Sequence, residues 1–244
     1  MTRTKRPTIA DVARSAGVSK GAVSYALNGL PGVSEITRAR IMGVAGELGW
    51  QPLPAVVIGG RGRHGGHPRI WSDDAQAVRT VVRYLAALDH RRIARVAGRP
   101  DFLHTQVRTD AFHEACAALG ITERTVVTDF SGDQGSDATR ELLSSSPRPT
   151  ALLFDNDVMA VAGSGVAHEM GLVVPRDVSI VAWDDSVLCR LVHPPLSALS
   201  RDIATFGRHA AQLLLDHAAG RQVTDLEDPP PRLVPRGSTA PAPA

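Results

Sequence analysis

The chain has 244 residues, enough for one large domain or two small ones at roughly 100–200 residues per domain. Its 43% hydrophobic and 21% charged residues, with a net charge of only +2, exclude a wholly disordered or fibrous chain. No run reaches the ~18 consecutive apolar residues of a membrane span. The basic N-terminus leads into a polar-interrupted segment rather than the apolar core of a signal peptide. We therefore expect a cytoplasmic protein with no membrane partner.

The charge is unevenly distributed along the chain. Residues 1–50 hold seven basic and three acidic side chains, a net charge of +4, which leaves −2 for the remainder. A small basic unit on a slightly acidic body indicates that the first fifty residues contact a polyanion.

Three short helices are predicted before residue 50. Thr8 and Asp11 form a capping box that starts a helix near residue 9, and Gly17 ends it. Ser19 caps a second helix that ends at 28–29. Ser34 caps a third helix that closes at Gly49, with five apolar residues expected to face inward: Ile36, Ile41, Val44, Ala45 and Leu48.

The segment 9–28 has the spacing of a helix-turn-helix, in which the second helix enters the major groove of DNA. The exposed positions Lys20, Gly21 and Tyr25 would then face base edges and phosphates. An ordinary helical hairpin is the alternative, and the charge asymmetry favours DNA binding. The residues predicted to contact DNA are Arg3, Lys5, Arg6, Thr8, Ser19, Lys20, Gly21, Ala22, Ser24, Tyr25, Asn28 and Ser34.

After Trp50 the composition changes, because prolines and glycines interrupt residues 51–71 around an extended run at 55–58. Strands then alternate with helices, which predicts a parallel sheet covered on both faces. The strands are expected near 69–72, 92–97, 124–128, 150–154 and 178–183, and the helices near 74–88, 105–119, 135–145 and 156–170. A strand near 196–199 and a helix near 203–219 precede a Pro-rich tail from Pro229.

Some chemically suggestive patterns are interpreted as structural. The run Gly60-x-Gly62-x-x-Gly65 has the glycine spacing of a dinucleotide-binding loop, but no helix follows it. His64 and His67 lack further ligands at metal-site spacing, and His90 is expected to be structural. The cysteines also lack ligand spacing, so Cys116 and Cys189 are predicted to be buried thiols.

Neither catalysis nor a cofactor is indicated by the sequence. The carboxylate pairs at 73–74 and 184–185 have no Ser/His or Cys/His constellation around them, so we expect no enzyme activity. The run Leu233-Val-Pro-Arg-Gly-Ser238 looks like a protease site from an expression tag. A native strand is the preferred interpretation, with an engineered scar as the alternative.

Five segments near the N-terminus form a recognisable set: Thr8-Ile-Ala-Asp-Val-Ala13, Gly17-Val-Ser19, Val23-Ser24, Leu27-Asn-Gly29 and Val33-Ser-x-x-Thr-Arg38. They resemble the DNA-binding headpiece of the lactose-repressor (LacI/GalR) family of regulators. Downstream, Leu88-Asp-His-Arg-Arg-Ile93 resembles that family's Leu-Gly-His-Arg-Arg-Ile run, with Asp89 in place of glycine. Further similar segments are 149–157, 171–179, 183–185, 195–197 and the native ending at 233–238.

The resemblance implies an α/β fold. A three-helix helix-turn-helix headpiece would precede a truncated periplasmic-binding-protein-like core, one doubly wound parallel-sheet lobe. Family members carry a hinge helix and two lobes, but Pro52-Leu-Pro54 leaves no room for the helix. The first lobe is reduced to strand 55–58 and helix 203–219. The expected divisions are a headpiece at 7–50, a linker and remnant strand at 51–71, a core at 72–236 with its second lobe at about 72–198, and a disordered tail at 237–244.

Three residues match the family's effector site. Arg108 matches the arginine that contacts the effector, Asn156 matches an amide of the pocket, and Asp184 matches a carboxylate of the pocket. An arginine fork, an amide and a carboxylate at strand ends suit the hydroxyls of a sugar or nucleoside. The alternative is that Asn156 caps a helix and Asp184 ends a strand. One lobe cannot enclose the ~70–90% of ligand surface that tight sites bury, which indicates a vestigial or altered effector domain.

Together these patterns predict a sequence-specific DNA-binding repressor that acts as a homodimer on a pseudo-palindromic operator. By resemblance, the helix at 156–170 is the candidate dimer surface. Base contacts are expected to be sparse, because Gly21, Ala22 and Tyr25 replace larger, hydroxyl-bearing or arginine residues common in the family. The alternatives are a degenerate regulator with weak, non-specific DNA binding and no ligand response, and a small-molecule-binding protein with a vestigial headpiece.

Overall fold

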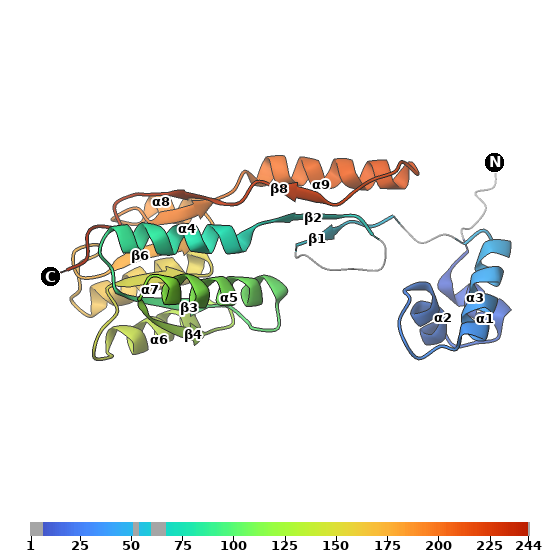
Figure 1. The fold of residues 1–244 in the computed structure, drawn as a ribbon, viewed down its shortest axis with the longest axis horizontal. Helices are drawn as coiled ribbons and strands as arrows, with labels where there is room; N and C mark the ends of the chain where they lie inside the picture. Colours follow the sequence, from blue (N-terminus) through green and yellow to red (C-terminus); the bar gives the residue numbers. More distant parts are fainter. Residues whose placement is uncertain (1–6, 51–53, 60–66, 244) are drawn as a thin grey trace. The chain divides into compact units, whose positions relative to one another are not determined.

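The computed structural model of the protein describes residues 7–50, 54–59 and 67–243 (Figure 1). The chain forms two compact units. Among the described residues, the first comprises 7–50, 54–57, 67–69 and 210–225, and the second comprises 58–59, 70–209 and 226–243. No helix in the described ranges is long and apolar enough to cross a membrane. Some residues singled out in the sequence lie outside the described ranges, namely Arg3, Lys5, Arg6, Pro52, His64 and the Gly60–Gly65 pattern.

The three N-terminal helices begin where their cap residues predict. They are α1 (Ile9–Ala16), α2 (Lys20–Leu27) and α3 (Glu35–Glu47). Thr8 forms the full capping box: its Oγ1 accepts from the Asp11 N–H at 3.3 Å, and its own N–H donates to Asp11 Oδ2 at 2.9 Å. Ser19 and Ser34 each accept a hydrogen bond from the first turn of the helix that follows. Local signals thus set all three starting points.

A small hydrophobic core joins these helices. Its buried members are Val12, Ala13, Ala16, Val23, Ala26, Ile41 and Ala45. The expectation that Ile36 and Leu48 face inward is wrong, because they are 85% and 38% exposed. Ile36 lies five residues before Ile41 and therefore about 140° around the helix from it. Leu48 is already the C-cap of α3, beyond its last helical residue.

The second unit contains a six-stranded sheet of order β4-β3-β5-β6-β7-β9. Its strands are β3 (Arg92–Ala97), β4 (Thr122–Val127), β5 (Ala151–Phe154), β6 (Ser179–Trp183), β7 (Ser197–Ser200) and β9 (Arg232–Val234). All neighbouring strands from β4 through β3, β5 and β6 to β7 pair in parallel, whereas β9 runs antiparallel to β7. This is the doubly wound parallel sheet that the sequence predicts.

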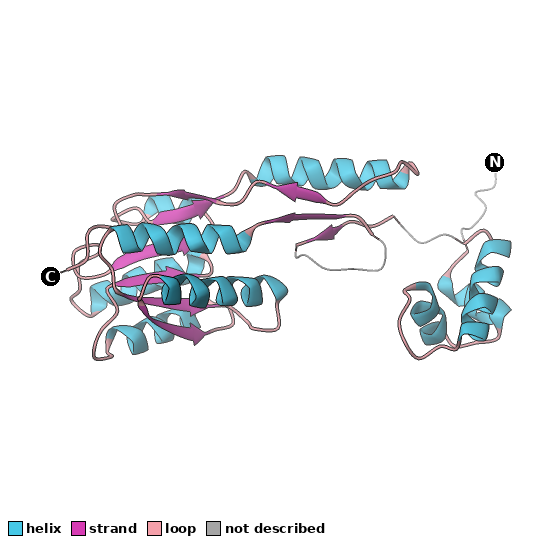
Figure 2. Ribbon diagram, viewed as in Figure 1, coloured by secondary structure: helices cyan, strands magenta, loops and turns pink. Residues whose placement is uncertain are grey.

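Helices cover both faces of this sheet (Figure 2). They are α4 (Asp74–Ala87) and α5 (Leu103–Ala118) on one face, and α6 (Gly132–Leu143), α7 (Asp157–Glu169) and the short α8 (Val187–Leu191) on the other. Successive strand residues point to opposite faces, so Ile93 packs under α4 and α5 while Ala94 packs under α6 and α7. Each of the two hydrophobic cores contains residues from every central strand. The strands are therefore buried on both faces, which explains their continuous apolar sequences.

A second sheet has three strands in the order β1-β2-β8: β1 (Val57–Ile58), β2 (Arg69–Ser72) and β8 (Leu226–Asp228). β2 and β8 are parallel, with Ile70 opposite Leu226. β1 and α9 (Ile203–Ala218) fall in the two segments assigned to the reduced first lobe, 55–58 and 203–219. β2 matches the strand predicted at 69–72, whereas β8 was not predicted.

The segment that follows β9 is ordered, which corrects the prediction of a disordered tail at 237–244. Ser238 is fully buried; its Oγ donates to the Ile180 carbonyl at 2.6 Å and accepts from the Ser197 N–H at 2.8 Å. Nε2 of buried His90 lies 3.1 Å from the Ala240 carbonyl, and burial lowers the pKa of His90. These buried hydrogen bonds outweigh the Pro-rich composition. Of the strand predicted at 233–238, only Leu233 and Val234 lie in a strand, β9, and residues 235–238 lie outside it, with a turn at 237–238.

Both cysteines are buried thiols, as predicted. Burial raises the pKa of Cys116 to about 12 and that of Cys189 to about 11. Neither thiol is therefore ionised near neutral pH.

Candidate functional site

The exposed side of α2 carries the predicted DNA-reading positions. Lys20 and Gly21 are exposed, and Tyr25 is 48% exposed, while Val23 and Ala26 on the opposite side are buried. Within the described ranges, no hydrogen bond or ion pair occupies the Lys20 ammonium or the Tyr25 hydroxyl. The helix thus exposes the Lys20 ammonium and the Tyr25 phenol on one side and buries apolar residues on the other.

Other predicted DNA-contacting residues hold the headpiece together. The hydroxyls of Thr8, Ser19 and Ser34 are used as helix caps. The Asn28 side-chain amide donates to the Ser24 carbonyl at 2.9 Å and so closes the end of α2. Ala22 supplies the amide that Ser19 caps. These contacts leave the lone pairs and donors of each polar group only partly used.

Arg38 of α3 fixes α2 in place, a role that the sequence analysis missed. Its Nη1 donates to the Ala26 carbonyl at 2.6 Å and the Tyr25 carbonyl at 3.3 Å. Its Nη2 donates to the Leu30 carbonyl at 2.8 Å. A cation at the C-terminal end of a helix also interacts favourably with the helix dipole. Arg38 therefore sets the orientation of the surface that carries Tyr25.

Replacing Arg38 by Ala is expected to destabilise the headpiece by about 2 kcal/mol, because three carbonyls lose a charged donor. Amide hydrogen exchange in α2 of the whole chain should then accelerate by about 30-fold. Arg40→Ala is the matched control, since Arg40 is exposed on the same helix. Equal exchange rates in the two variants would contradict the role of Arg38.

The three predicted effector residues lie at one edge of the six-stranded sheet. Asn156 follows β5, Asp184 follows β6, and Arg108 of α5 reaches the same edge, where its Nη1 donates to the Asp155 carbonyl at 3.3 Å. The carboxyl ends of parallel strands meet there, which is where open α/β sheets bind ligands. The structure thus brings together residues that lie 76 positions apart in the sequence.

Arg108 is largely buried and rigidly held. Its guanidinium carbon lies 3.6 Å from the centre of the Trp183 ring, a cation–π contact. Its Nε and Nη2 approach Asp74 Oδ2 at 2.9 and 2.8 Å. The arginine is preorganised, but protein groups already use most of its donors.

The side chains of Asn156 and Asp184 differ in how far other protein groups occupy them. Asn156 is the N-cap of α7, accepting from the Met159 N–H at 2.8 Å and donating to the Phe130 carbonyl at 2.9 Å. Asp184 keeps an exposed surface and has a φ of 69°, a costly value for a residue other than glycine. Nearby protein nevertheless displaces water from its carboxylate and raises its pKa, against the attraction of Arg108. The described structure gives this carboxylate no ion-pair partner.

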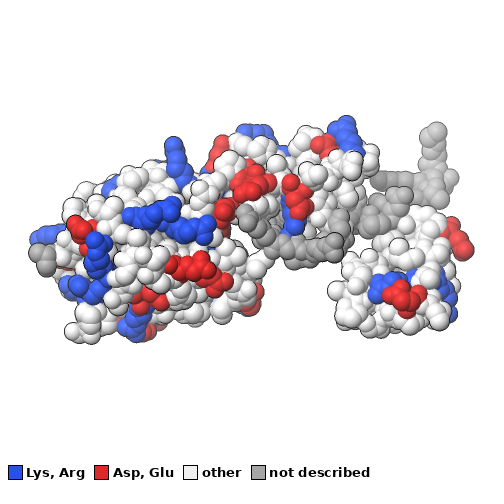
Figure 3. All heavy atoms as spheres, viewed as in Figure 1, with Lys and Arg blue, Asp and Glu red and all other residues white. Residues whose placement is uncertain are grey.

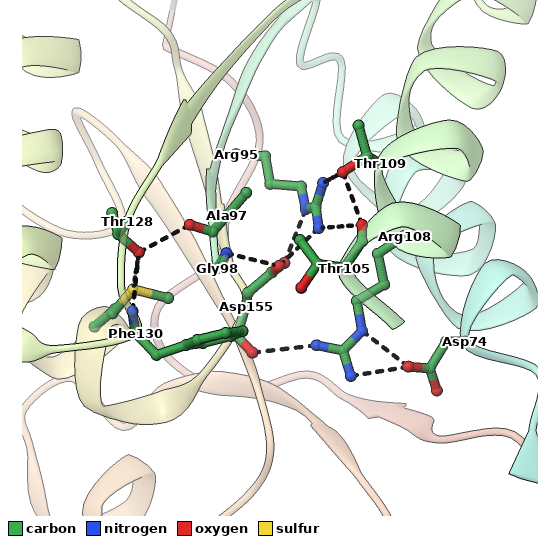
Figure 4. A network of polar contacts seen from close by, with 11 residues as sticks. Asp74, Arg95, Ala97, Gly98, Thr105, Arg108, Thr109, Thr128, Phe130 and Asp155 are labelled. Atoms are coloured by element: carbon green, nitrogen blue, oxygen red, sulfur yellow. Dashed lines mark hydrogen bonds and ion pairs between the residues drawn. The ribbon is translucent and has the colours of Figure 1, made fainter. Parts of the chain in front are cut away.

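A buried ion pair lies beneath the site (Figure 4). Arg95 and Asp155 have fully buried side chains and form a two-pronged contact, Nε to Oδ1 at 2.8 Å and Nη2 to Oδ2 at 2.7 Å. The Gly98 N–H donates to the same carboxylate at 3.0 Å, and Arg95 Nη1 donates to Thr109 at 2.8 Å. The pair ties β3 to β5 and α5. The sequence signal for this pair is an arginine inside an apolar strand, and neither residue was among the predicted site residues.

Aromatic rings border the site and were also missed. Phe102 stacks on His104 with ring centres 5.5 Å apart, and Phe130 lies 6.0 Å from His104. Partial loss of solvent, and then Arg108, lower the pKa of His104. A Cβ on Gly98 would stand 1.8 Å from the Phe130 ring, so only glycine permits this arrangement. Flat apolar rings beside hydrogen-bonding groups suit the faces of sugar or nucleoside rings.

Charges elsewhere on the second unit are mixed, as the face shown in Figure 3 illustrates. Exposed pairs such as Arg140 with Glu169 and Arg91 with Asp89 neutralise each other. No cluster of three or more His, Cys, Asp or Glu suited to a metal ion occurs in the described part of the chain.

The N-terminal part of the chain is a three-helix headpiece whose second helix faces outward. A doubly wound sheet with a polar site at its carboxyl edge follows it. These features define a helix-turn-helix protein with a periplasmic-binding-protein-like domain. Residues 8–52 match the bacterial regulatory proteins of the lacI family, and residues 82–239 match a periplasmic binding protein-like domain. The chain belongs to the LacI family, as its sequence motifs predict.

Individual relatives agree with this assignment. A LacI family transcriptional regulator from Bifidobacterium animalis is 45% identical, with a TM-score of 0.74 over 77% of this chain and 69% of that structure. An HTH-type transcriptional regulator of Streptomyces limosus is 34% identical over 77% of this chain and 55% of its own length. A complex of the transcriptional regulator CelR with cellobiose shares the fold, at 23% identity and a TM-score of 0.69 over 96% of this chain and 100% of that chain. The chain spans about half the length of the curated relatives it matches.

Proposed function

We propose that this protein is a DNA-binding transcriptional repressor whose α2 enters the major groove of a pseudo-palindromic operator. Residues 7–50 would bind DNA, and residues 72–236, together with the ordered segment after them, would form the effector and dimerisation domain. The observation that carries the proposal is the outward face of α2, where Lys20, Gly21 and Tyr25 are exposed on a helix fixed by Arg38. A DNA target implies work in the cytoplasm.

The predicted roles of Lys20 and Tyr25 differ. Lys20→Ala is expected to weaken binding to all DNA equally and to lower the salt slope by about one, as for a phosphate contact. Tyr25→Ala is expected to change the preference between sequences, as for a base contact. Fluorescence anisotropy would compare a palindromic duplex, selected from a random pool by the wild-type protein, with random duplex at two salt concentrations.

The outcome separates the alternatives for this function. A high ratio of selected to random affinity supports a specific regulator, and Tyr25→Ala should reduce that ratio. Binding without such a ratio indicates a degenerate regulator, and no DNA binding at all indicates a vestigial headpiece. Equal losses on both duplexes for Tyr25→Ala would rule out its base-reading role.

The site at the carboxyl edge is proposed to bind a small polyhydroxylated effector. Arg108, the open carboxylate of Asp184 and the rings of Phe102, His104 and Phe130 support this class. Cellobiose, ribose and adenosine are suitable probes for sugars and nucleosides. Isothermal titration that detects none of the three at millimolar concentration would refute the effector proposal while leaving DNA binding untouched.

A homodimer is proposed to form through α7 and α8. These helices contact each other and expose four large apolar side chains, Val158, Val187, Leu188 and Leu191. Val187, Leu188 and Leu191 share one side of α8, whereas Cys189 on the other side is buried. An apolar surface of this kind is typical of an interface between subunits.

A further inference from the structure

Asp74, the first residue of α4, accepts hydrogen bonds from two arginines that come from distant parts of the chain. Its Oδ2 lies 2.9 Å from Nε and 2.8 Å from Nη2 of Arg108. Its Oδ1 accepts from Nη2 of Arg201 at 3.2 Å. The same Arg201 nitrogen donates to Ser72 Oγ at 2.6 Å, and Ser72 Oγ donates to Asp74 Oδ1 at 3.4 Å. One buried carboxylate therefore joins the effector-site arginine to a second cation.

The partners of Asp74 stand at two chain connections. Ser72 is the last residue of β2, just before the chain enters α4, and Arg201 follows β7, just before the chain enters α9. Asp74 and Arg108 lie on the two helices that pack on one face of the six-stranded sheet. Asp74 therefore links Arg108 to both connections.

Asp74 also decides where the Arg108 guanidinium lies. The carboxylate holds the edge formed by Nε and Nη2, the Asp155 carbonyl holds Nη1, and the Trp183 ring supports the face. Arg108 is only 8% exposed, so water cannot replace a lost partner without rearrangement. Removing the negative charge would also leave Arg108 and Arg201 facing one neutral group, and the two cations would separate.

We propose that Asp74 is the positioning residue of the effector site: it sets Arg108 for the ligand and passes ligand contact at Arg108 to Ser72 and Arg201. A ligand group that takes donors from Arg108 loosens the hold of Arg108 on Asp74, and Arg201 then takes a larger share of the carboxylate. By reciprocity, the state of the two connections alters ligand affinity. This inference rests on the proposed function for the identity of the site, but its geometry can be tested without a ligand.

The ligand-free test uses Trp183 as a reporter of the guanidinium that covers it. In a background of Trp50→Phe and Trp71→Phe, Trp183 is the single tryptophan. Asp74→Asn is expected to raise the acrylamide quenching constant of Trp183 about threefold, because the displaced guanidinium uncovers the ring. Asp73→Asn is the matched control: it makes the same change one residue away and keeps an N-cap for α4. Equal quenching in both variants would overturn the positioning role.

The ligand test uses whichever of cellobiose, ribose and adenosine the wild-type protein binds most tightly. Asp74→Asn should raise the dissociation constant about tenfold or more, with Asp73→Asn near wild type. Urea unfolding of both variants separates affinity from stability. Lost affinity with unchanged Trp183 quenching would indicate general destabilisation and overturn the proposal. If the wild type binds none of the probes, the effector function fails, and the quenching result alone decides the role of Asp74.

Discussion

Asp155→Asn is expected to lower the free energy of unfolding of the second unit by about 3–5 kcal/mol, because it leaves the Arg95 guanidinium buried without a counter-charge. Asparagine keeps the size of the side chain but supplies one oxygen where the carboxylate supplies two. Those oxygens accept from Arg95 and from the Gly98 N–H. The loss should exceed that of any exposed ion pair by several-fold.

Urea unfolding followed by circular dichroism measures this difference. Glu141→Gln is the control, because it neutralises one partner of the exposed pair that Glu141 forms with Arg124. The double variant Arg95→Met, Asp155→Leu should recover much of the loss, since it removes both charges together. A change below about 1 kcal/mol for Asp155→Asn would show that Arg95 finds another partner or water.

Leu191→Glu is expected to convert the proposed dimer into a monomer and to reduce affinity for a palindromic duplex by about 100-fold or more. Leu191 is 75% exposed on α8, so the monomer fold should tolerate the change. The loss arises because the second headpiece no longer binds as part of the same molecule. Affinity for a single half-site should stay unchanged.

Light scattering gives the mass in solution, and anisotropy compares whole and half operators. Val127→Glu is the control, because Val127 is a similarly exposed apolar residue on strand β4, away from α8. A Leu191→Glu protein that remains dimeric would place the interface elsewhere. A monomeric wild-type protein would contradict the dimer proposal directly.

The sequence predicted best those elements that short-range interactions specify. Thr8, Ser19 and Ser34 each act within one helical turn, so reading a few neighbouring residues located all three N-terminal helices. The alternation of apolar runs and amphipathic segments likewise located β3, β5 and β6, because burial on both faces demands an apolar sequence. The strand ends that carry Asn156 and Asp184 followed from the same pattern.

Features that depend on distant partners were not predictable in this way. In the sequence, Arg95 is a charged residue inside an apolar strand with no nearby partner. Its partner, Asp155, lies 60 positions later and contacts it only in the folded structure. The Phe130 ring requires Gly98 beneath it, a dependence that neither residue shows alone. A strand at 233–238 was expected only through the family resemblance, and β9 itself covers just Arg232–Val234 between prolines. It forms because β7 offers an edge, with Leu199 opposite Leu233. Local composition there favours a loop, and tertiary pairing overrides it.

The ordered segment after β9 also affects how the protein is handled. The run Leu233-Val-Pro-Arg-Gly-Ser238 looks like a protease site of the kind placed in purification tags. In the folded protein the Arg236 side chain is held by Asp185 at 2.7 Å and by the Leu196 carbonyl at 2.8 Å, and Ser238 is buried. A protease must bind such a segment in extended form, so cleavage after Arg236 requires local opening. The rate of proteolysis at this bond therefore reports how often the sheet edge comes apart.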